Sequence, residues 1–199
     1  MVTGVILAGG MSSRMGRDKA TLPVRSQRLI DLVISHLRPC VDRLMVVGRA
    51  DNVHEFVDLP VGALVTDIKP GCGPLMGIYT GLMHTETPLN LFVACDMPWV
   101  QARLIERLLG ACRQDTGVVA SLHPVEGVQP FPLVCHVEAC RTIGGLLDRG
   151  ECSVQALLRQ PQARLMQIEE PALWRSFVNV NTLADYAKLD HETTLTPRY

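Results

Sequence analysis

The amino-acid sequence predicts an α/β protein with a mostly parallel central sheet that is covered by helices on both faces. Short runs of apolar, often β-branched residues alternate along the chain with longer segments of helical periodicity. Strands that are apolar throughout are typical of parallel sheets buried on both faces. Because the ligands of such sheets bind beyond the carboxyl ends of the strands, we expect the functional residues in the loops that follow strands.

Each element is predicted from a local pattern. Residues 2–8 form an apolar run that indicates a strand, whereas residues 27–38 carry a helical apolar stripe that Pro39 ends, and residues 101–113 carry a similar stripe. We expect residues 1–190 to form one domain and residues 191–199 to be a polar tail. The other predicted strands are residues 44–47, 62–66, 89–95, 118–122, 131–135, 164–168 and 177–180, and the other predicted helices are residues 75–84, 137–147, 153–159 and 182–189.

The composition excludes several classes of protein. The 199 residues are 47% hydrophobic and 20% charged, with a net charge of −1, so we expect neither a nucleic acid nor an anionic membrane as a partner. The longest apolar runs, such as residues 91–95, are far shorter than the roughly 20 residues of a membrane-spanning helix. The start of the chain lacks the basic region of a signal peptide, and its seven scattered cysteines form no CxxC pair. We therefore expect a cytoplasmic protein with free thiols and no structural zinc site.

The loop after the first predicted strand combines glycine with positive charge. It runs from Gly9 to Lys19 and contains Arg14 and Arg17, but it has neither the P-loop nor the GxGxxG spacing. Glycines let backbone N–H groups turn toward a phosphate, and the cationic side chains neutralise its charge. The alternative is an ordinary tight turn whose basic residues are solvated. The pattern favours a phosphate-binding loop.

Two aspartates follow other predicted strands. Asp96 ends the strand 89–95, where a carboxylate suits a hard cation such as Mg²⁺, although an aspartate there can also cap the next helix. Asp67 follows the strand 62–66 and precedes the glycine-rich segment 71–77. It is either a ligand-binding residue or a solvated acid beside a simple turn. We expect Asp96 to bind the metal.

Residues 7–20, LAGGMSSRMGRDKA, resemble the signature LAGGxSxRMGxDKA of nucleotidyltransferases in the molybdenum cofactor guanylyltransferase (MobA) family. Further resemblances follow in the same order along nearly the whole chain: CDMP at 95–98, Asp67 with GPLMG at 73–77, QP at 129–130, GECSV at 150–154 and FVNVNT at 177–182. The resemblance implies a Rossmann-like three-layer α/β/α nucleotidyltransferase fold. It also implies a nucleotide-binding half at about residues 1–100 and an acceptor-binding half at about residues 101–190.

The family's roles are carried over to the matching positions. The asparagines of FVNVNT would lie on one face of the strand 177–180 and bind the acceptor, although Asn181 can also cap the last helix. Many family members have a nucleotide-contacting asparagine where this chain has Val47 or Gly48. The resemblance implies catalytic roles for Arg14, Lys19 and Asp96, nucleotide binding by Leu7, Ala8, Gly9, Gly10, Lys19, Asp67 and Asp96, acceptor binding by Asn179 and Asn181, and Mg²⁺ binding by Asp96.

The implied reaction transfers GMP from GTP to molybdopterin, forms the guanine dinucleotide cofactor and releases pyrophosphate. The backbone of residues 7–10, the turn 71–77 and Asp67 are the expected polar partners of guanine. Alternatives are a cytidylyltransferase acting on the same cofactor, a sugar-1-phosphate nucleotidyltransferase, or a regulatory relative that only binds nucleotide. The expected partners are GTP and molybdopterin, with transient contact to molybdenum-insertion proteins or apo-molybdoenzymes. The oligomeric state stays open.

Overall fold

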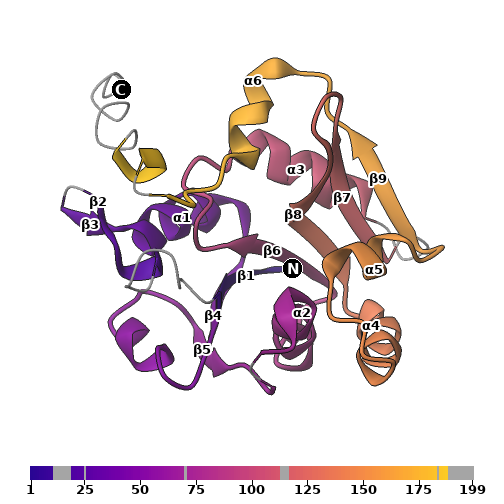
Figure 1. The fold of residues 1–199 in the computed structure, drawn as a ribbon, viewed down its shortest axis with the longest axis horizontal. Coiled ribbons are helices and arrows are strands. Elements are labelled where there is room, and N and C mark those ends of the chain that lie inside the picture. The colour runs from indigo at the N-terminus through magenta and orange to yellow at the C-terminus, as the bar shows by residue number, and fades with distance from the viewer. Residues whose placement is uncertain (11–18, 25, 70, 113–116, 183, 188–199) are drawn as a thin grey trace.

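A single seven-stranded sheet forms the centre of the molecule (Figure 1). The computed structural model describes residues 1–10, 19–24, 26–69, 71–112, 117–182 and 184–187. The strand order is β5-β4-β1-β6-β8-β7-β9, and every neighbouring pair is parallel except those that involve β8. The predicted mostly parallel sheet is therefore confirmed. The strands are β1 (Val2–Ala8), β4 (Arg43–Gly48), β5 (Ala63–Thr66), β6 (Leu89–Ala94), β7 (Val118–His123), β8 (Gly127–His136) and β9 (Ala163–Gln167).

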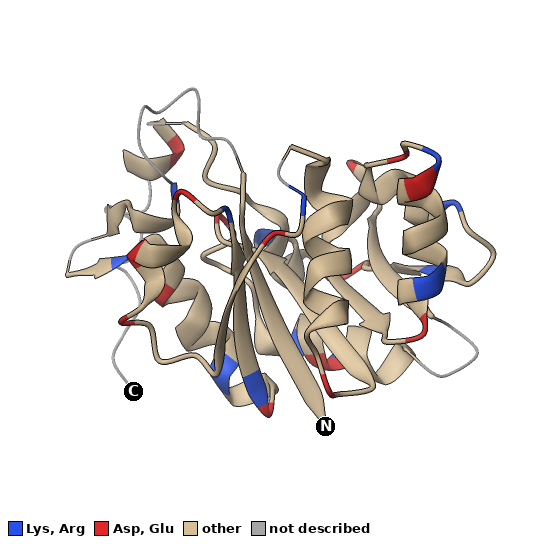
Figure 2. Ribbon diagram, turned by 90° about the horizontal axis from the view of Figure 1, so that it is seen from below, with Lys and Arg blue, Asp and Glu red and all other residues tan. Residues whose placement is uncertain are grey.

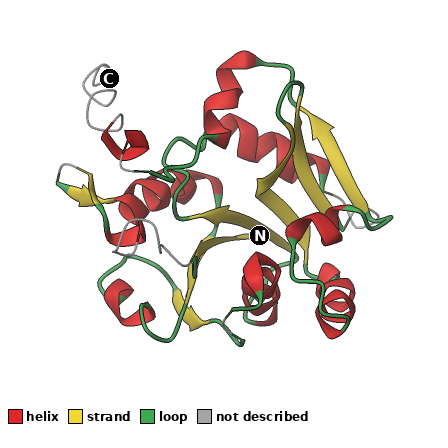
Figure 3. Ribbon diagram, in the orientation of Figure 1, coloured by secondary structure: helices red, strands yellow, loops and turns green. Residues whose placement is uncertain are grey.

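Helices connect most of the strands (Figure 3). A two-stranded hairpin, β2 (Pro23–Val24) with β3 (Gln27–Arg28), stands apart from the main sheet. Residues 27 and 28 therefore belong to a strand and not to the predicted helix, which begins at Leu29. The α-helices are α1 (Leu29–Leu37), α2 (Gly73–Met83), α3 (Ala102–Ala111), α4 (Ala139–Asp148), α5 (Val154–Leu158) and α6 (Pro171–Trp174), and the 3₁₀ helices are η1 (Lys19–Thr21), η2 (Arg38–Cys40), η3 (Val53–Phe56) and η4 (Arg175–Phe177).

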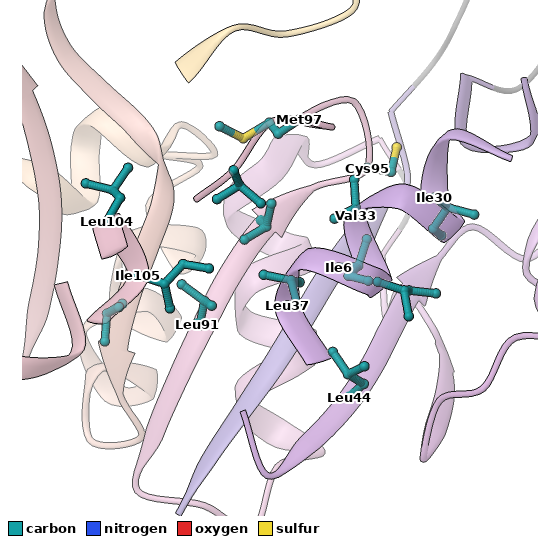
Figure 4. Close-up of a cluster of buried hydrophobic side chains, with 14 of the residues drawn as sticks. Ile6, Ile30, Val33, Leu37, Leu44, Leu91, Cys95, Met97, Leu104 and Ile105 are labelled. Carbon is teal, nitrogen blue, oxygen red and sulfur yellow. The ribbon is translucent and has the colours of Figure 1, made fainter. Parts of the chain in front are cut away.

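The two faces of the sheet have separate apolar cores. Helices α1 and α3 cover one face, where Ile6 and Leu91 pack against side chains such as Val33 and Ile105 (Figure 4). Helices α2, α4 and α5 cover the opposite face. Successive side chains of β1 alternate between these cores because a strand has a period of two. The three-layer α/β/α architecture is confirmed.

The predicted strand at 177–180 is wrong. Helix η4 ends at Phe177, and residues 178–180 then run on without joining a sheet. Phe177 and Val180 are buried, so the alternating pattern here marks an anchored loop and not a strand. The backbone N–H of Val180 donates to the carbonyl of Asp96 at 2.9 Å. The segment is thereby tied to the end of β6.

Figure 2 shows acidic and basic residues interspersed over the ribbon. Within the described ranges, every helix is too short or too polar to cross a membrane.

Residues 184–187 are helical and lie within the last predicted helix. Thr182 and Asp185 cap this helix. The Thr182 N–H donates to Asp185 Oδ2 at 2.9 Å, and the Asp185 N–H donates to Thr182 Oγ1 at 3.1 Å. The cap is thus Thr182 and not Asn181.

Candidate active site

A cavity of about 700 Å³ lies at the carboxyl ends of the parallel strands; we call it the first cavity. The ends of β1, β4, β5 and β6 form its walls, together with the start of α2. This is the edge at which a parallel sheet gathers its loops. Six of the residues predicted from the sequence line it, namely Leu7, Gly9, Gly10, Lys19, Asp67 and Asp96, together with Val47, Arg49, Asp51, Gly71, Gly73, Pro74, Gly77, Ala94, Cys95 and Phe131.

Of the residues predicted to bind the nucleotide or to take part in catalysis, Ala8 and Arg14 are not among these. The side chain of Ala8 is 1% exposed and lies in the core beneath α1, on the face opposite to Leu7. Strand alternation therefore leaves only the Ala8 backbone available to a nucleotide. Arg14 lies outside the described residues, so its catalytic role stays a prediction.

Lys19, Asp96 and Asn181 come together although they are far apart in the sequence. The ammonium of Lys19 donates to Asn181 Oδ1 at 2.7 Å and lies 3.5 Å from Asp96 Oδ2. The Asp96 side chain is 17% exposed, and its Oδ1 atom is buried without a hydrogen-bond partner in the described parts of the chain. Burial raises the pKa of Asp96 above its ordinary value, and the nearby Lys19 opposes that shift. Asp96 is therefore a carboxylate that lacks part of the solvation its charge requires.

Asp67 is fixed between β5 and α2. Its backbone N–H donates to the carbonyl of Gly48 at 2.8 Å, and its Oδ1 accepts a hydrogen bond from the buried Thr80 hydroxyl at 3.0 Å. The first residue of α2 has to be glycine, because at Gly73 φ is +70° and a Cβ would lie 2.7 Å from the Cys152 carbonyl oxygen. The predicted glycine-rich turn thus brings the start of α2 close to the cavity.

The end of β4 carries Val47 and Gly48, where the resemblance placed a nucleotide-contacting asparagine in many family members. Val47 lines the cavity, and Gly48 cannot carry a larger side chain because a Cβ there would lie 2.9 Å from Asn52 Oδ1. The next residue, Arg49, lines the cavity and donates from Nη1 to the Gly10 carbonyl at 2.9 Å. Sequence reasoning missed Arg49 and Asp51. A charged residue two positions after the predicted strand 44–47 was the available signal for Arg49.

A second cavity of about 840 Å³ is lined by aromatic and polar residues; we call it the second cavity. Asn179 and Asn181 both line it, so the loop brings them to one cavity although they do not lie on a strand. The Arg175 guanidinium lies 5.0 Å from the centroid of the Trp99 ring. Sequence reasoning missed the aromatic residues of this cavity, such as Trp99 and Trp174, because no local sequence motif indicates that they line a site. The lining residues are Trp99, His123, Val125, Glu126, Trp174, Arg175, Phe177, Val178, Asn179 and Asn181.

The residues at Asp96 fit a magnesium ion. The described chain holds no cluster of three or more His, Cys, Asp or Glu side chains of the kind that encloses a metal. Mg²⁺ needs no such cluster, since it is commonly held by one or two carboxylates together with waters and substrate phosphates. The unpaired Oδ1 of Asp96 offers the hard oxygen that this ion prefers. Asp96 could therefore hold Mg²⁺ when phosphates are present.

Comparisons with known proteins agree with the fold. Residues 4–165 match the model of the family described as "MobA-like NTP transferase domain". The molybdenum cofactor guanylyltransferase of Vibrio parahaemolyticus is 31% identical over 191 residues, covering 94% of this chain and 95% of that protein. Molybdopterin-guanine dinucleotide biosynthesis protein A of Archaeoglobus fulgidus superimposes with a TM-score of 0.82 at 20% identity, covering 98% of this chain and all of that one. Rv0371c of Mycobacterium tuberculosis, in complex with manganese, superimposes with a TM-score of 0.68 at 20% identity, covering 96% and 98% of the two chains.

Proposed function

The chain belongs to the family of MobA-like NTP transferases, and from that premise we propose that this nucleotidyltransferase transfers GMP from GTP to molybdopterin. The product is the molybdopterin guanine dinucleotide, and pyrophosphate is released. GTP occupies the first cavity and molybdopterin occupies the second. Except for Phe131 in the first cavity and Trp99 in the second, the lining residues follow the proposed nucleotide-binding half at about residues 1–100 and acceptor-binding half at about residues 101–190.

One observation carries the proposal. The hydrogen bond from Lys19 Nζ to Asn181 Oδ1 joins a residue of the first cavity to a residue of the second. The carboxylate of Asp96, which also lines the first cavity, lies 3.5 Å from the Lys19 ammonium. A reaction between two bound phosphates needs both to meet beside positive charge, because their oxygens repel each other. The junction of the two cavities supplies that charge.

The chemistry follows from the ionisation of the acceptor. The terminal phosphate of molybdopterin is a monoester with a second pKa of about 6, so it is largely ionised at neutral pH. One of its oxygens forms a bond to the α-phosphorus of GTP while the bond between that phosphorus and the β-phosphate oxygen breaks. No side chain has to remove a proton from the attacking group. The protein therefore acts by positioning the two phosphates and by stabilising their charge.

Named residues divide this work. Lys19 stabilises the negative charge between the two phosphates, and Arg14 is proposed to do the same from the glycine loop. Asp96 would hold Mg²⁺, which when bound neutralises phosphate charge and aligns the reacting oxygens. The backbones of residues 7–10 and Asp67 bind the nucleotide. Asn181 and Asn179 offer amide groups to the acceptor.

The second cavity suits a planar heterocycle. Its rings, Trp99 and Trp174 among them, offer flat apolar faces, while Arg175 and the two asparagines provide hydrogen-bond donors at the edges. A pterin ring has flat faces and a polar edge, so both kinds of contact are used. The nucleotide base is held in the other cavity, which keeps the two heterocycles apart and brings their phosphates together.

We also propose in which compartment the reaction takes place and which proteins the enzyme contacts. Seven free cysteines agree with a reducing compartment such as the cytoplasm. Transient contacts with molybdenum-insertion proteins or with apo-molybdoenzymes would deliver the substrate and receive the product.

The test is pyrophosphate release by the purified protein in the presence of Mg²⁺. GTP, CTP and ATP are each supplied with and without molybdopterin, and the dinucleotide product is identified by mass. We expect release only when molybdopterin is present, with GTP preferred over CTP and ATP by at least about 2 kcal/mol, or roughly thirtyfold in specificity. A dominant cytosine dinucleotide would contradict the guanylyl assignment. Release that does not depend on molybdopterin would contradict the acceptor.

A further inference from the structure

The base edges of the nucleotides differ in how they pair with a carboxylate. Guanine presents two neighbouring donors, N1–H and the 2-amino group, whereas adenine and cytosine present a donor beside an acceptor. A carboxylate only accepts hydrogen bonds, and its two oxygens can pair with two neighbouring donors at once. An aspartate in the wall of the first cavity is therefore a candidate reader of guanine.

Asp51 is placed for such a contact. It lines the first cavity, and its side chain is 71% exposed. Its Oδ1 accepts from Arg49 Nε at 2.8 Å and its Oδ2 accepts from Arg49 Nη2 at 3.2 Å. Each carboxylate oxygen has a second lone pair that these two bonds leave available. The hydrogen bonds from Arg49 also hold the pKa of Asp51 below its ordinary value, so the group is an acceptor at neutral pH.

Arg49 holds the carboxylate in position. Its side chain is 23% exposed, and its Nη1 donates to the carbonyl of Gly10 at 2.9 Å. One guanidinium thus links the glycine loop after β1 to the turn after β4. A planar guanidinium that binds a carboxylate through two parallel bonds also fixes the plane of that carboxylate. The orientation of Asp51 is thereby tied to the loop that precedes the phosphate-binding residues.

The turn that carries Asp51 is itself rigidly held. Asn52 is 2% exposed; its Oδ1 accepts from the Arg49 backbone N–H at 2.7 Å, and its Nδ2 donates to the Ala8 carbonyl at 2.8 Å. The backbone N–H of Val53 also donates to the Arg49 carbonyl at 2.9 Å. A buried asparagine with both ends of its amide paired costs free energy to move. Asp51 therefore stands on a prearranged turn and not on a free loop.

We infer that Asp51, oriented by Arg49, is a specificity-determining residue that reads the N1–H and 2-amino groups of guanine in the first cavity. This inference rests on the proposed use of GTP and names a residue that decides it. Two other acids line this cavity: Asp96 is proposed to hold Mg²⁺, and Asp67 already accepts a hydrogen bond from Thr80 through Oδ1. Asp51 adds a side-chain contact to the backbone contacts expected from residues 7–10.

The test compares nucleotides that differ only at position 2 of the purine. Inosine triphosphate lacks the 2-amino group, and xanthosine triphosphate has a carbonyl there. Pyrophosphate release with molybdopterin and displacement of a fluorescent GTP analogue are measured for each, on the wild-type chain and on Asp51→Asn. The wild type is expected to prefer GTP over inosine triphosphate by about tenfold or more, the effect of one hydrogen bond to a charged group.

Asp51→Asn is expected to change the preference and not merely to weaken binding. An asparagine amide places a donor opposite the 2-amino group, so GTP should lose about tenfold or more while inosine triphosphate changes little. The same amide donor fits the 2-carbonyl of xanthosine triphosphate, so the variant should gain use of that nucleotide. Equal losses with all three nucleotides, or an unchanged profile, would overturn the inference and leave the Arg49–Asp51 pair as a surface ion pair.

A matched control separates this result from general effects. Asp58 is also an exposed aspartate bound through both oxygens by one arginine, Arg28, at 2.9 Å for each bond, but it lines neither cavity. Asp58→Asn should keep the wild-type nucleotide profile. Should the wild type itself prefer CTP, the proposed function fails before any variant is compared. A wild type that prefers GTP with an Asp51→Asn variant of the same profile refutes only the role of Asp51.

Discussion

The first and second cavities are built from different parts of the fold. Five of the described residues lining the first cavity are glycines that follow β1 or lie in and just before α2. The second cavity is lined by two tryptophans and a phenylalanine from a loop and short helices, together with a histidine at the end of β7. Glycines let backbone N–H groups approach an anion closely, and aromatic rings offer flat faces to a planar molecule. One fold thus provides a backbone surface for phosphates beside a side-chain surface for a ring system.

The two cavities also differ in how their polar groups are paired. Of the described residues that line them, only Asp96 has a buried side-chain oxygen without a hydrogen bond. In the second cavity, His123 accepts hydrogen bonds through Nδ1 from the backbone N–H groups of Val125 and Glu126. Its ring packs against that of Trp174, with 4.5 Å between the ring centroids. The first cavity therefore holds a carboxylate whose charge is incompletely solvated, and a bound ligand can supply the missing contact. In the second cavity, His123 already has its partners within the protein.

The largest effect that this contrast predicts is on Asp96. Asp96→Asn keeps the shape of the side chain but removes the negative oxygen that would bind Mg²⁺. We expect turnover to fall by at least about a thousandfold, several kcal/mol in the barrier, while the fold is retained. Pyrophosphate release and circular dichroism measure the two properties. An active variant with Mg²⁺ as the only metal would show that Asp96 does not bind the ion.

Lys19 should have the next largest effect. Lys19→Ala removes the ammonium at the junction of the cavities, and we expect turnover to fall by about a hundredfold or more, as when a donor to a developing negative charge is lost. Arg43→Ala is the control. Arg43 lies at the start of β4, pairs with the exposed Glu86 and lines neither cavity. Near-normal rates for Lys19→Ala would mean that the junction does not stabilise the reacting phosphates.

The second cavity should respond in a different kinetic parameter. Trp99→Leu keeps an apolar side chain but removes the ring beside Arg175, so we expect the KM for molybdopterin to rise by about tenfold. The KM for GTP should stay the same, because Trp99 does not line the first cavity. Trp99→Phe should recover most of the loss. A rise in the KM for GTP instead would exchange the roles of the two cavities.

The sequence predicts the first cavity better than the second for a physical reason. Leu7, the glycine loop, Lys19 and Asp96 belong to contiguous motifs at strand ends, and a parallel sheet necessarily gathers such ends at one edge. Trp99 and Arg175 meet only because η4 and the following loop pack against the end of β6, which no local pattern specifies. For the same reason the strand predicted at 177–180 is wrong, although Asn181 reaches the site.

Arg49 and Asp51 show where prediction from sequence fails even at the first cavity, the better predicted of the two. The family pattern has an asparagine near Val47 or Gly48, and in this chain the buried Asn52 holds the turn while Arg49 lines the cavity. A pattern of residue types along the chain does not reveal which side chain of a turn faces a ligand. That depends on hydrogen bonds such as the one between Arg49 and the Gly10 carbonyl. Fold class and strand-end residues are therefore predictable here, whereas the residues between them are not.

The smallest predicted effect concerns the stability of Asp96→Asn as a function of pH. Burial raises the pKa of Asp96 in the folded protein above its ordinary value of 3.8, so the folded state binds a proton there more tightly than the unfolded state. Ionised Asp96 consequently lowers stability, and this effect is absent below pH 3.8, appears as the pH rises through the raised pKa, and is complete above it. Asparagine does not ionise. In metal-free buffer we expect the variant to be more stable than the wild type at neutral pH by at most about 1 kcal/mol, the lower end of the cost of a buried polar group left unpaired, because Lys19 opposes part of that cost. Urea unfolding from pH 4 to pH 7 measures both proteins, and the difference between them should grow with pH. Parallel curves, or a wild type that gains on the variant as the pH rises, would mean that Lys19 fully compensates the buried charge and that the first cavity holds no incompletely solvated carboxylate.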